Sequence, residues 1–506
     1  MTDRLSIRPG TYYDSVTLML ASRDAEDVDG VTFAAAVTAT PVNLSLLEAQ
    51  VFDIADANPG PNDLVVAVRA EDDNAVDAAE QTIADRLTGS ADIAARSPGD
   101  FRPRSFRAAS RRNPDINLAF VAVPGRFATA EVAQALESGL DVFCFSDGLS
   151  LEDEAALKKV AIDKGLLLMG ADCGTAIIDG VALGFANGVE RGPIGIVGAS
   201  GTGIQEVTCL LASAGVGVSH AIGVGGRDMS SVVGGAMTMR GIELLDADES
   251  TSIIVVISKP PDGTVGGRVV EAAGRATKPV VVGFLGGGGK HDDAPANVDL
   301  VGSLEATAHE AARLAGAEID SAAELPQRHT PGFVRGLFCG GSLCYEAMIV
   351  LAATGRQVAS NVPIREEWRI SDVATSEGHT FIDFGEDGLT AGRAHPMIDP
   401  TLRNERLERE SRDPQVGVIV LDVILGFGAH PDPAGGLAPI ISAALARRPD
   451  DLTIAVALCG AKGDPQDLDD QARRLAEAGA FVTRNSAQAA RSAIAAVTKT
   501  SENSNG

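Results

Sequence analysis

The sequence predicts an α/β protein in which tandem doubly wound parallel-sheet domains follow an N-terminal α+β module. Three observations lead to this prediction: a regular alternation of apolar strands and amphipathic helices, an internal repeat, and the composition. Of 506 residues, 56 are glycine, 45% are hydrophobic and only 4% are aromatic. Small residues let helices pack closely on a sheet, and a chain of this length and hydrophobic content can form several buried cores.

The N-terminal segment alternates extended and helical patterns on a short period. We expect extended segments at Arg4–Tyr13, Val31–Thr40 and Leu64–Ala70, and helices at Ser15–Ala25, Asn43–Asp53 and Asn74–Leu87. This βαβαβα order predicts a compact α+β module over residues 1–88. The following stretch is rich in Ser, Arg, Pro and Gly and contains RPRSFRAASRR, which predicts a solvated linker over 89–115 more than a ligand-binding arm.

A regular α/β alternation begins at Ile116. The apolar strands INLAFVAVP, DVFCFSD and LLLMGA are separated by the helical segments TAEVAQALESG and LEDEAALKKVAIDKG. Continuous apolar strands separated by amphipathic helices are typical of a parallel sheet that is covered on both faces. This pattern predicts a domain over 116–189, and we interpret KKVAIDK within it as a solvated helix face.

An internal repeat is the most informative feature of the sequence. The first copy opens with IGIVGASGTG and the helix IQEVTCLLASAG, and the second opens with FVRGLFCGGS and LCYEAMIVLAATG. Each copy continues with a turn that carries glycine and acid (GVGGRD and DFGEDG), two further buried strands, and a short strand before an Ala-rich helix. The shared order predicts two similar doubly wound domains, over 190–320 and 331–500, with a disordered tail at 501–506. Extra sequence in the second copy includes RNERLERESR, which we interpret as a solvated helix face.

Charge and cysteine usage narrow the classes of function. The 69 acidic and 42 basic residues give a net charge of −27, which repels phosphate backbones and anionic lipid, so we expect no nucleic acid and no membrane as partner. The six cysteines show no CxxC spacing and are interpreted as reduced thiols, with no metal site. The N-terminus lacks the apolar core of a signal peptide, and no apolar stretch reaches the roughly 18 residues of a membrane helix. These features predict a cytoplasmic protein.

In each repeat a buried strand runs into a glycine- and serine-rich turn that opens directly onto a helix. The first amides of a helix have no intrahelical acceptor, and the helix dipole adds partial positive charge, so each turn is suited to bind an anion. The predicted phosphate-binding residues are Gly198, Ala199, Ser200, Gly201, Thr202, Gly203, Gly340, Gly341 and Ser342. One such turn is equally well explained by tight packing. Two equivalent turns in a duplicated chain favour binding, with both helix ends aimed at one shared phosphoryl group.

These segments also carry a family resemblance. IGIVGASGTGIQEV through GRD resembles the ligase domain of the succinyl-CoA synthetase α subunit, and LESGLDVFCFSDGL through ADCGTAI resembles the end of its CoA-binding domain. FVRGLFCGGSLCYEAMIVLAATG onward resembles the carboligase domain of the β subunit. A single chain that fuses these parts, with YYDSVTLM near its start, resembles the FdrA family. The resemblance implies Rossmann-like and flavodoxin-like domains: a degenerate CoA-binding-type domain at 116–189, an α-like ligase domain at 190–320 and a β-like carboligase domain at 331–500.

The sequence departs from succinyl-CoA synthetase at several points. The loop after PVVVG reads GFLGGGGKHDDAPANVDLVGS, so we interpret His291 as a loop residue and not as the family's phosphohistidine. Ser258 and Lys259 stand where the family has a glutamate after the strand. No ATP-grasp region separates the α-like and β-like parts, and the glycine loop that holds CoA phosphates is missing. CoA therefore stays an open alternative as a ligand, with no cofactor assigned.

The resemblance implies a function. The FdrA family is linked to an oxamate carbamoyltransferase of several different subunits, which converts oxamate and carbamoyl phosphate to oxalurate and phosphate. We therefore predict an FdrA-type subunit of such an enzyme, or of a related acyl-phosphate transferase, which binds a small anionic substrate and acts with other subunits. The alternatives are an acyl-CoA synthetase (ADP-forming) that needs a separate ATP-grasp subunit, and a non-catalytic scaffold subunit.

The predicted catalytic residues follow from the two turns. Ser200, Thr202 and Ser342 are expected to hold the phosphate, and Arg227 is expected to neutralise its charge. Asp228 either orients Arg227 or caps a turn. Asp228, Lys259 and His291 form a second tier of candidates.

Overall fold

The computed structural model describes the chain except for residues 12, 51, 53, 55–58, 61–62, 94–102, 288–293, 321–328, 391 and 498–506. Contacts divide the chain into two compact units. The first comprises Met1–Arg102 together with Phe384–Leu402, and the second comprises Pro103–Asp383 and Arg403–Gly506. A segment of the extra sequence in the second repeat therefore belongs with the N-terminal module.

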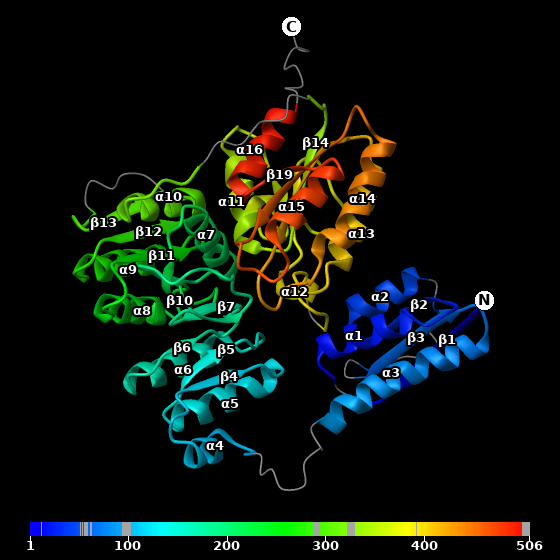
Figure 1. Ribbon diagram of the computed structural model, residues 1–506, viewed down its shortest axis with the longest axis horizontal. Helices are drawn as coiled ribbons and strands as arrows, with labels where there is room; N and C mark the ends of the chain where they lie inside the picture. Colours follow the sequence, from blue (N-terminus) through cyan, green and yellow to red (C-terminus); the bar gives the residue numbers. More distant parts are fainter. Residues whose placement is uncertain are drawn as a thin grey trace. The chain divides into compact units, whose positions relative to one another are not determined.

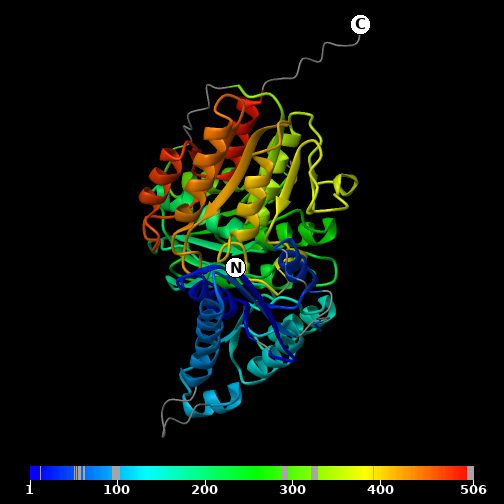
Figure 2. The same ribbon diagram turned by 90° about the vertical axis from the view of Figure 1, so that its right-hand side faces the viewer.

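The N-terminal module is a small antiparallel sheet covered by helices. Its strands pair in the order β1-β3-β2, with β1 at Thr2–Arg8, β2 at Val31–Thr38 and β3 at Leu64–Ala70. Its helices are α1 (Ser15–Glu26), α2 (Pro41–Ala49) and α3 (Asp73–Ile93). Helices α1 and α3 pack together on one face of the sheet, and α3 is the long helix in Figures 1 and 2. Leu47 of α2 joins a second core on the opposite face. The six predicted elements occur in the predicted order.

The next region contains a three-stranded parallel sheet. Its strands are β4 (Leu118–Val121), β5 (Asp141–Cys144) and β6 (Leu168–Met169), and its helices are α5 (Gly125–Glu137) and α6 (Leu151–Asp163). The structure differs from the predicted linker in two ways. Helix α3 continues beyond residue 88, and α4 (Phe106–Arg112) begins at Ser105, whose side chain accepts a hydrogen bond from the amide of Ala108. That local cap makes a helix out of the basic stretch.

The first repeat forms a seven-stranded sheet in the order β13-β12-β11-β9-β10-β7-β8. The strands are β7 (Thr175–Ile178), β8 (Val181–Gly184), β9 (Ile194–Gly198), β10 (Val218–Gly223), β11 (Ile253–Ser258), β12 (Val280–Phe284) and β13 (Val298–Val301). The helices are α7 (Gly201–Ser213), α8 (Ala236–Ala247), α9 (Gly263–Arg275) and α10 (Leu304–Leu314). In Figure 1, α7 and α10 cover one face and α8 and α9 the other. The β7–β8 hairpin falls within the predicted 116–189 domain, but β7 pairs antiparallel with β10, so the hairpin extends this sheet instead.

The second repeat forms a six-stranded parallel sheet in the order β15-β16-β14-β17-β18-β19. The strands are β14 (Phe333–Phe338), β15 (Ala359–Ser360), β16 (Thr380–Asp383), β17 (Val416–Ile424), β18 (Thr453–Cys459) and β19 (Phe481–Thr483). The helices are α11 (Gly341–Ala352), α12 (Asp387–Thr390, in the N-terminal unit), α13 (Thr401–Glu410), α14 (Pro433–Arg447), α15 (Leu468–Glu477) and α16 (Ser486–Ala496), with a 3₁₀ turn at Glu366–Trp368. Helices α11 and α16 pack together, as do α14 and α15 (Figure 1).

The strand order confirms the predicted duplication. In the first repeat β9, which precedes the glycine turn, lies between β10 and β11, which gives the order 2-1-3-4-5 of flavodoxin-like sheets. In the second repeat β14 lies between β16 and β17, and the same order results when the two-residue edge strand β15 is set aside. Ligands of such sheets bind at the carboxyl ends of the strands, where the strand order reverses. Both glycine turns leave their sheets at this point. No helix among the described residues has both the length and the apolar character needed to cross a bilayer.

Candidate functional site

The first glycine turn leads from β9 into α7. Ser200 is the residue that caps α7: it is buried, and its Oγ accepts a hydrogen bond from the amide of Gly203 at 2.9 Å. The amide of Ala199 is not available to a ligand, because it donates a hydrogen bond to the carbonyl of Ile257 in the neighbouring strand. The amides of Gly201 and Thr202 donate to no other described residue, as expected in the first turn of a helix. These two amides are the open donors of the first turn.

The second glycine turn leads from β14 into α11 and is arranged differently. Gly340 occupies the cap position and has no side chain to offer. The carboxylate of Asp422, at the end of β17, accepts from the amides of Cys339 and Gly340 at 2.8 Å each. The predicted role of the Gly340 amide as a phosphate donor is thus not what the structure shows, because a carboxylate from the neighbouring strand already occupies it. The amides of Gly341 and Ser342 donate to no other described residue.

The two turns meet each other. The Oγ atoms of Ser200 and Ser342 are 2.6 Å apart, so the two side chains share a hydrogen bond. A Cβ atom on Gly340 would lie 3.1 Å from the Cβ of Thr202, so these residues face each other as well. The structure therefore brings together the hydroxyl residues that the sequence predicted on two separate loops.

Lys259 is the cation at this meeting point. Its Nζ would lie 3.0 Å from a Cβ atom on Gly341, while Oδ2 of Asp383 would lie 2.5 Å from the same atom. Lys259 forms no ion pair with a described carboxylate. Lys259 is half-buried at the end of β11, in the loop where we placed it as a second-tier candidate. An anion at Gly341 would therefore meet both the ammonium group of Lys259 and the carboxylate of Asp383.

Carboxyl groups at the site are what the sequence analysis missed. Asp383 is the last residue of β16, and Asp422 lies in β17. These two strands flank β14, which leads into the second glycine turn. Burial raises the pKa of Asp422 to about 6, although the Arg403 guanidinium and the two amide donors act to lower it. The signal was present, since an aspartate at the carboxyl end of an apolar strand points to the ligand edge of a parallel sheet.

Arg227 does not lie at the glycine turns, which corrects our prediction. Its Nη1 donates to the carbonyl of Leu149 at 2.9 Å, and its Nη2 lies 2.8 Å from Oε2 of Glu154. These partners belong to the preceding sheet region. The buried carboxylate of Glu154 attracts this guanidinium, so it is not available to a phosphate between α7 and α11.

Asp228 acts as a cap and an ion-pair partner, not as the residue that orients Arg227. Its carboxylate accepts from the amides of Met237 and Thr238 at the start of α8, and it lies 2.9 Å from Nζ of Lys158. Lys158 is fully buried and also pairs with Glu154 at 2.8 Å. The interpretation of KKVAIDK as a solvated face is therefore wrong at Lys158, because buried carboxylates on two elements neutralise it.

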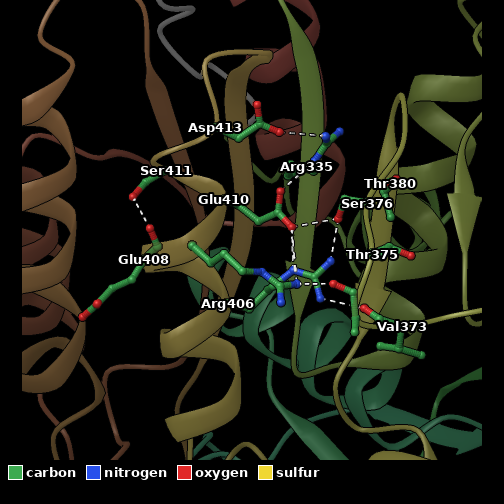
Figure 3. Close-up of polar contacts among 12 residues, drawn as sticks. Arg335, Val373, Thr375, Ser376, Thr380, Arg406, Glu408, Glu410, Ser411 and Asp413 are labelled. Atoms are coloured by element: carbon green, nitrogen blue, oxygen red, sulfur yellow. Dashed lines mark hydrogen bonds and ion pairs between the residues drawn. The ribbon is translucent and has the colours of Figure 1, made fainter. Parts of the chain in front are cut away.

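A second charged run is also buried. In α13, Arg403, Arg406 and Glu410 are nearly inaccessible to solvent, so the interpretation of RNERLERESR as a solvated face is wrong at these three residues, while the remaining charged residues of the run are exposed. Glu410 bonds to Arg335 of β14 at 2.9 Å, to Arg406 at 2.5 Å and to Ser376 at 2.8 Å (Figure 3). Figure 3 shows these side chains converging from β14, α13 and the intervening loop. This network attaches the extra sequence of the second repeat to its sheet.

The two helices of the glycine turns also meet through buried carboxyl groups. Glu206 of α7 accepts from the amide and hydroxyl of Ser486, at the start of α16. Glu346 of α11 accepts from the same hydroxyl and, at 2.7 Å, from the amide of Leu304 at the start of α10. Each repeat therefore caps the last helix of the other. Burial, followed by the neighbouring Glu346, raises the pKa of Glu206 well above its usual value, and burial also raises the pKa of Glu346.

The remaining predicted residues are placed as follows. Gly198 ends β9, and a Cβ atom there would lie 2.8 Å from Cγ1 of Ile204, so close packing explains this glycine. His291 lies outside the described residues. All six cysteines are free and buried, which confirms that they are core residues without a disulfide; burial raises the pKa of Cys173 to about 12.

The sequence matches three families. Residues 337–496 match the CoA-ligase family, residues 189–286 match the CoA binding domain family, and residues 1–100 match the family described as AllF, heavy metal-associated domain. The CoA binding match falls on the segment where we predicted the ligase domain, not on 116–189. Residues 1–100 contain neither cysteine nor histidine. The thiolate and imidazole ligands that soft metals prefer are therefore missing from this module.

Two kinds of relatives are found. The chain is 40% identical over 507 aligned residues to protein YahF of Escherichia coli K12, with 96% of this chain and 97% of YahF covered. It is 29% identical over 187 residues to subunit alpha 1 of the ADP-forming succinate–CoA ligase of Archaeoglobus fulgidus, covering 36% of this chain and 60% of that subunit. It is 29% identical over 180 residues to subunit SauD of the ADP-forming sulfoacetate-CoA ligase of Bilophila wadsworthia, covering 34% and 59%. The chain thus spans less than two thirds of these ligase subunits.

Among solved structures, the dinucleotide forming acetyl-coenzyme A synthetase 1 of Ca. Korarchaeum cryptofilum is similar with a TM-score of 0.33 and 16% identity, covering 75% of this chain and 82% of that chain. The fold, the paired helix ends and the matched families define a succinyl-CoA synthetase-like protein of the CoA-ligase type. The chain belongs to the FdrA family, as its full-length similarity to YahF shows.

Proposed function

We propose that this chain binds the phosphoryl group of an acyl phosphate between the N-terminal ends of α7 and α11. In this proposal it is the phosphate-binding subunit of a carbamoyltransferase that converts oxamate and carbamoyl phosphate to oxalurate and phosphate, or of a related acyl-phosphate transferase. The observation that carries the proposal is the meeting of Ser200 and Ser342 at 2.6 Å, next to amides that have no partner among the described residues.

The chemistry of the transfer fits these groups. The acceptor nitrogen attacks the acyl carbon, the bond from that carbon to the bridging oxygen breaks, and phosphate leaves with the electron pair. The attacking nitrogen loses one proton, which passes to the released phosphate or to solvent. Amide donors that face the departing oxygens stabilise the charge that develops on them, an effect of roughly 10²–10³ in rate for each donor. The amides of Gly201 and Thr202 and the ammonium group of Lys259 would supply this stabilisation.

A second candidate is an acyl-CoA synthetase that works with a separate ATP-grasp subunit. The matches to the CoA-ligase and CoA binding domain families favour it, as do the alignments with ADP-forming ligase subunits. In that case the same phosphate site would hold an acyl phosphate whose acyl group moves to the CoA thiol, with release of phosphate and of the thiol proton. The two candidates share the phosphate site and differ in the acceptor.

Thermal unfolding of the full chain tests the proposal, with separate additions of carbamoyl phosphate, phosphate, CoA and ATP. A ligand at about 100 times its Kd stabilises the folded state by about 2.7 kcal/mol. We expect protection by carbamoyl phosphate and by phosphate, and we expect Ser200→Ala and Ser342→Ala to lose it. Ser219→Ala is the matched control, because Ser219 is an equally buried hydroxyl that bonds to Thr251 away from the turns.

Other patterns of protection would favour one of the alternative functions. Protection by CoA or ATP without protection by carbamoyl phosphate would favour the synthetase. If none of the four ligands protects the chain, either alone or with partner subunits, the phosphate site is refuted and the scaffold alternative gains.

A further inference from the structure

A cavity of about 940 Å³ lies between the two repeats, beside the phosphate site. Its walls come from the start of α9 and the end of β12 in the first repeat, and from α11 and the loop at Ile364–Arg365 in the second. Lys259 directly precedes Pro260 of the wall, and Tyr345 follows Ser342 by one turn of α11. The cavity therefore begins one helical turn from the paired serines, and its volume is in the range of small-molecule sites.

The charge of the cavity contrasts with that of the protein. The chain has a net charge of −27, yet no carboxylate is among the described residues that line the cavity. Arg365 is the charged residue of the lining, and its guanidinium stacks at 4.9 Å over the ring of Trp368. Stacking holds the guanidinium plane and leaves its N–H edges free to bind an anion in two-pronged fashion. No ion pair joins Arg365 to another described residue.

The rest of the lining is apolar. Phe284, Leu300, Val270 and Ile349 supply hydrocarbon surface, and the half-buried Tyr345 supplies a hydroxyl group. Burial raises the pKa of Tyr345, which keeps this hydroxyl protonated as a hydrogen-bond donor. An occupant must therefore combine an apolar body with at least one negative charge.

Helix α9 keeps the floor of the cavity open. Gly263 and Gly267, four residues apart, lie on the same face, and a Cβ atom on either would have no heavy atom within 4 Å. Packing thus does not require glycine at these two positions, whereas at Gly266 it does, because Pro261 lies 2.8 Å away. A glycine inside a helix costs about 1 kcal/mol relative to alanine. Side chains at Gly263 or Gly267 would project into the cavity and reduce it.

We propose that this cavity binds an organic carboxylate with an apolar body, with its carboxylate on Arg365 and its body on the glycine face of α9. Its assignment as the site of the acyl acceptor, one helical turn from the phosphate, rests on the function proposed above in the form of a related acyl-phosphate transferase, because oxamate has no apolar body. The binding itself does not depend on that function. A carboxylate of this kind would enter the cavity whether or not an acyl phosphate occupies the paired helix ends.

Isothermal titration of the full chain with phenylacetate tests the site, with phenylacetamide as the uncharged counterpart and AMP as a nucleotide. We expect phenylacetate to bind, and Arg365→Gln to weaken its binding about tenfold, as loss of one partner of a close charge pair does. Gly267→Leu should weaken binding, because its side chain occupies the face of α9 on which the apolar body rests, while its higher helix propensity preserves folding. Phenylacetamide lacks the negative charge. Its affinity for the natural chain should therefore be no higher than the affinity of phenylacetate for Arg365→Gln.

Matched controls are available in the same fold. Gly436→Leu places the same side chain inside another helix, α14, where a Cβ atom would meet only Asn404 at 3.8 Å, and it should leave binding unchanged. Arg275→Gln removes an exposed arginine from the far end of α9. Binding of phenylacetate that Gly267→Leu leaves undiminished, binding of AMP in its place, or no binding at all would overturn the proposal. Phosphate protection in Gly267→Leu reports separately on the paired helix ends, so failure of one proposal is distinguishable from failure of the other.

Discussion

The N-terminal ends of α7 and α11 occupy equivalent places in the two repeats, but their amides are satisfied differently. In the first repeat the neighbouring strand presents Ile257, whose backbone carbonyl accepts from Ala199. At the same register of the second repeat the neighbouring strand presents Asp422, whose carboxylate accepts from Cys339 and Gly340. One helix end therefore has no anion of its own, and the other carries a built-in carboxylate.

This difference shows that two copies of the same fold need not bind an anion equally well at equivalent helix ends. A phosphate that approached the start of α11 would meet the negative charge of Asp422, while at the start of α7 it would meet open amides and the cap hydroxyl of Ser200. The first repeat thus offers the stronger anion site, and the second contributes Ser342 and the amides beyond Gly340. The paired site is asymmetric although the glycine turns leave equivalent strands of the two sheets.

The largest loss of unfolding free energy is expected from Asp422→Ala. The substitution leaves two buried amides without an acceptor and removes the carboxylate that lies 3.9 Å from the buried guanidinium of Arg403. Removal of one partner of a buried charged network costs about 3–5 kcal/mol of unfolding free energy. Urea denaturation measures this loss. Asp262→Ala, which removes the exposed cap of α9, is the control and should cost about 1 kcal/mol; an equal effect of the two would contradict the assignment.

The pH dependence of stability separates the two helix ends further. Burial raises the pKa of Asp422 to about 6 in the folded chain, compared with about 3.9 in an unfolded chain. A carboxyl whose pKa is raised by folding contributes stability that is complete below the unfolded value and is lost as the pH rises through the folded value. We expect this group to cost about 3 kcal/mol between pH 4 and pH 7.

The measurement is urea denaturation at several pH values between 4 and 7, for the natural chain and for Asp422→Asn. The asparagine does not titrate, so the difference between the two proteins should change across this window. Parallel stability curves would show that Asp422 does not titrate in the folded state near pH 6.

A smaller loss is expected from the carboxyl groups that link the repeats. Glu206→Ala leaves the amide of Ser486 without its acceptor, and Glu346→Ala does the same to Leu304. Each should cost about 1–3 kcal/mol, the penalty for an unsatisfied buried donor. Because the two carboxyl groups share Ser486, the double variant should cost less than the sum. Denaturation of the four proteins of this cycle gives the coupling, and strict additivity would mean that the two groups act independently.

The smallest change in unfolding free energy is expected from substitution of the two serines. Ser200 caps α7, so Ser200→Ala should cost about 1 kcal/mol. Ser342 lies inside α11, where no side chain caps the helix, and Ser342→Ala should cost less, about 0.5 kcal/mol for the shared hydrogen bond. Thermal unfolding of the unliganded variants measures both. A larger loss from Ser342→Ala would reverse our comparison of the two helix ends.

Much of the fold could be predicted because its signals are local. Apolar strands, amphipathic helices and Gly/Ser turns recur in the same order, and this order predicted the two doubly wound sheets and both glycine turns. The position of Ser200 at the start of α7 follows from a strand–turn–helix pattern a few residues long. The basic stretch before Ile116 was predicted as linker because its composition hides the cap at Ser105.

The sequence by itself therefore determined the sheets, the duplication and the position of each helix end. The tertiary structure alone decided what those ends contact. It placed Ser200 against Ser342, gave the amide of Gly340 to Asp422, paired Arg227 with Glu154 and buried Lys158 between carboxylates. The physical reason is that such charges and donors are satisfied by residues distant in the chain or on other elements, so their partners and their burial depend on how the sheets and helices pack.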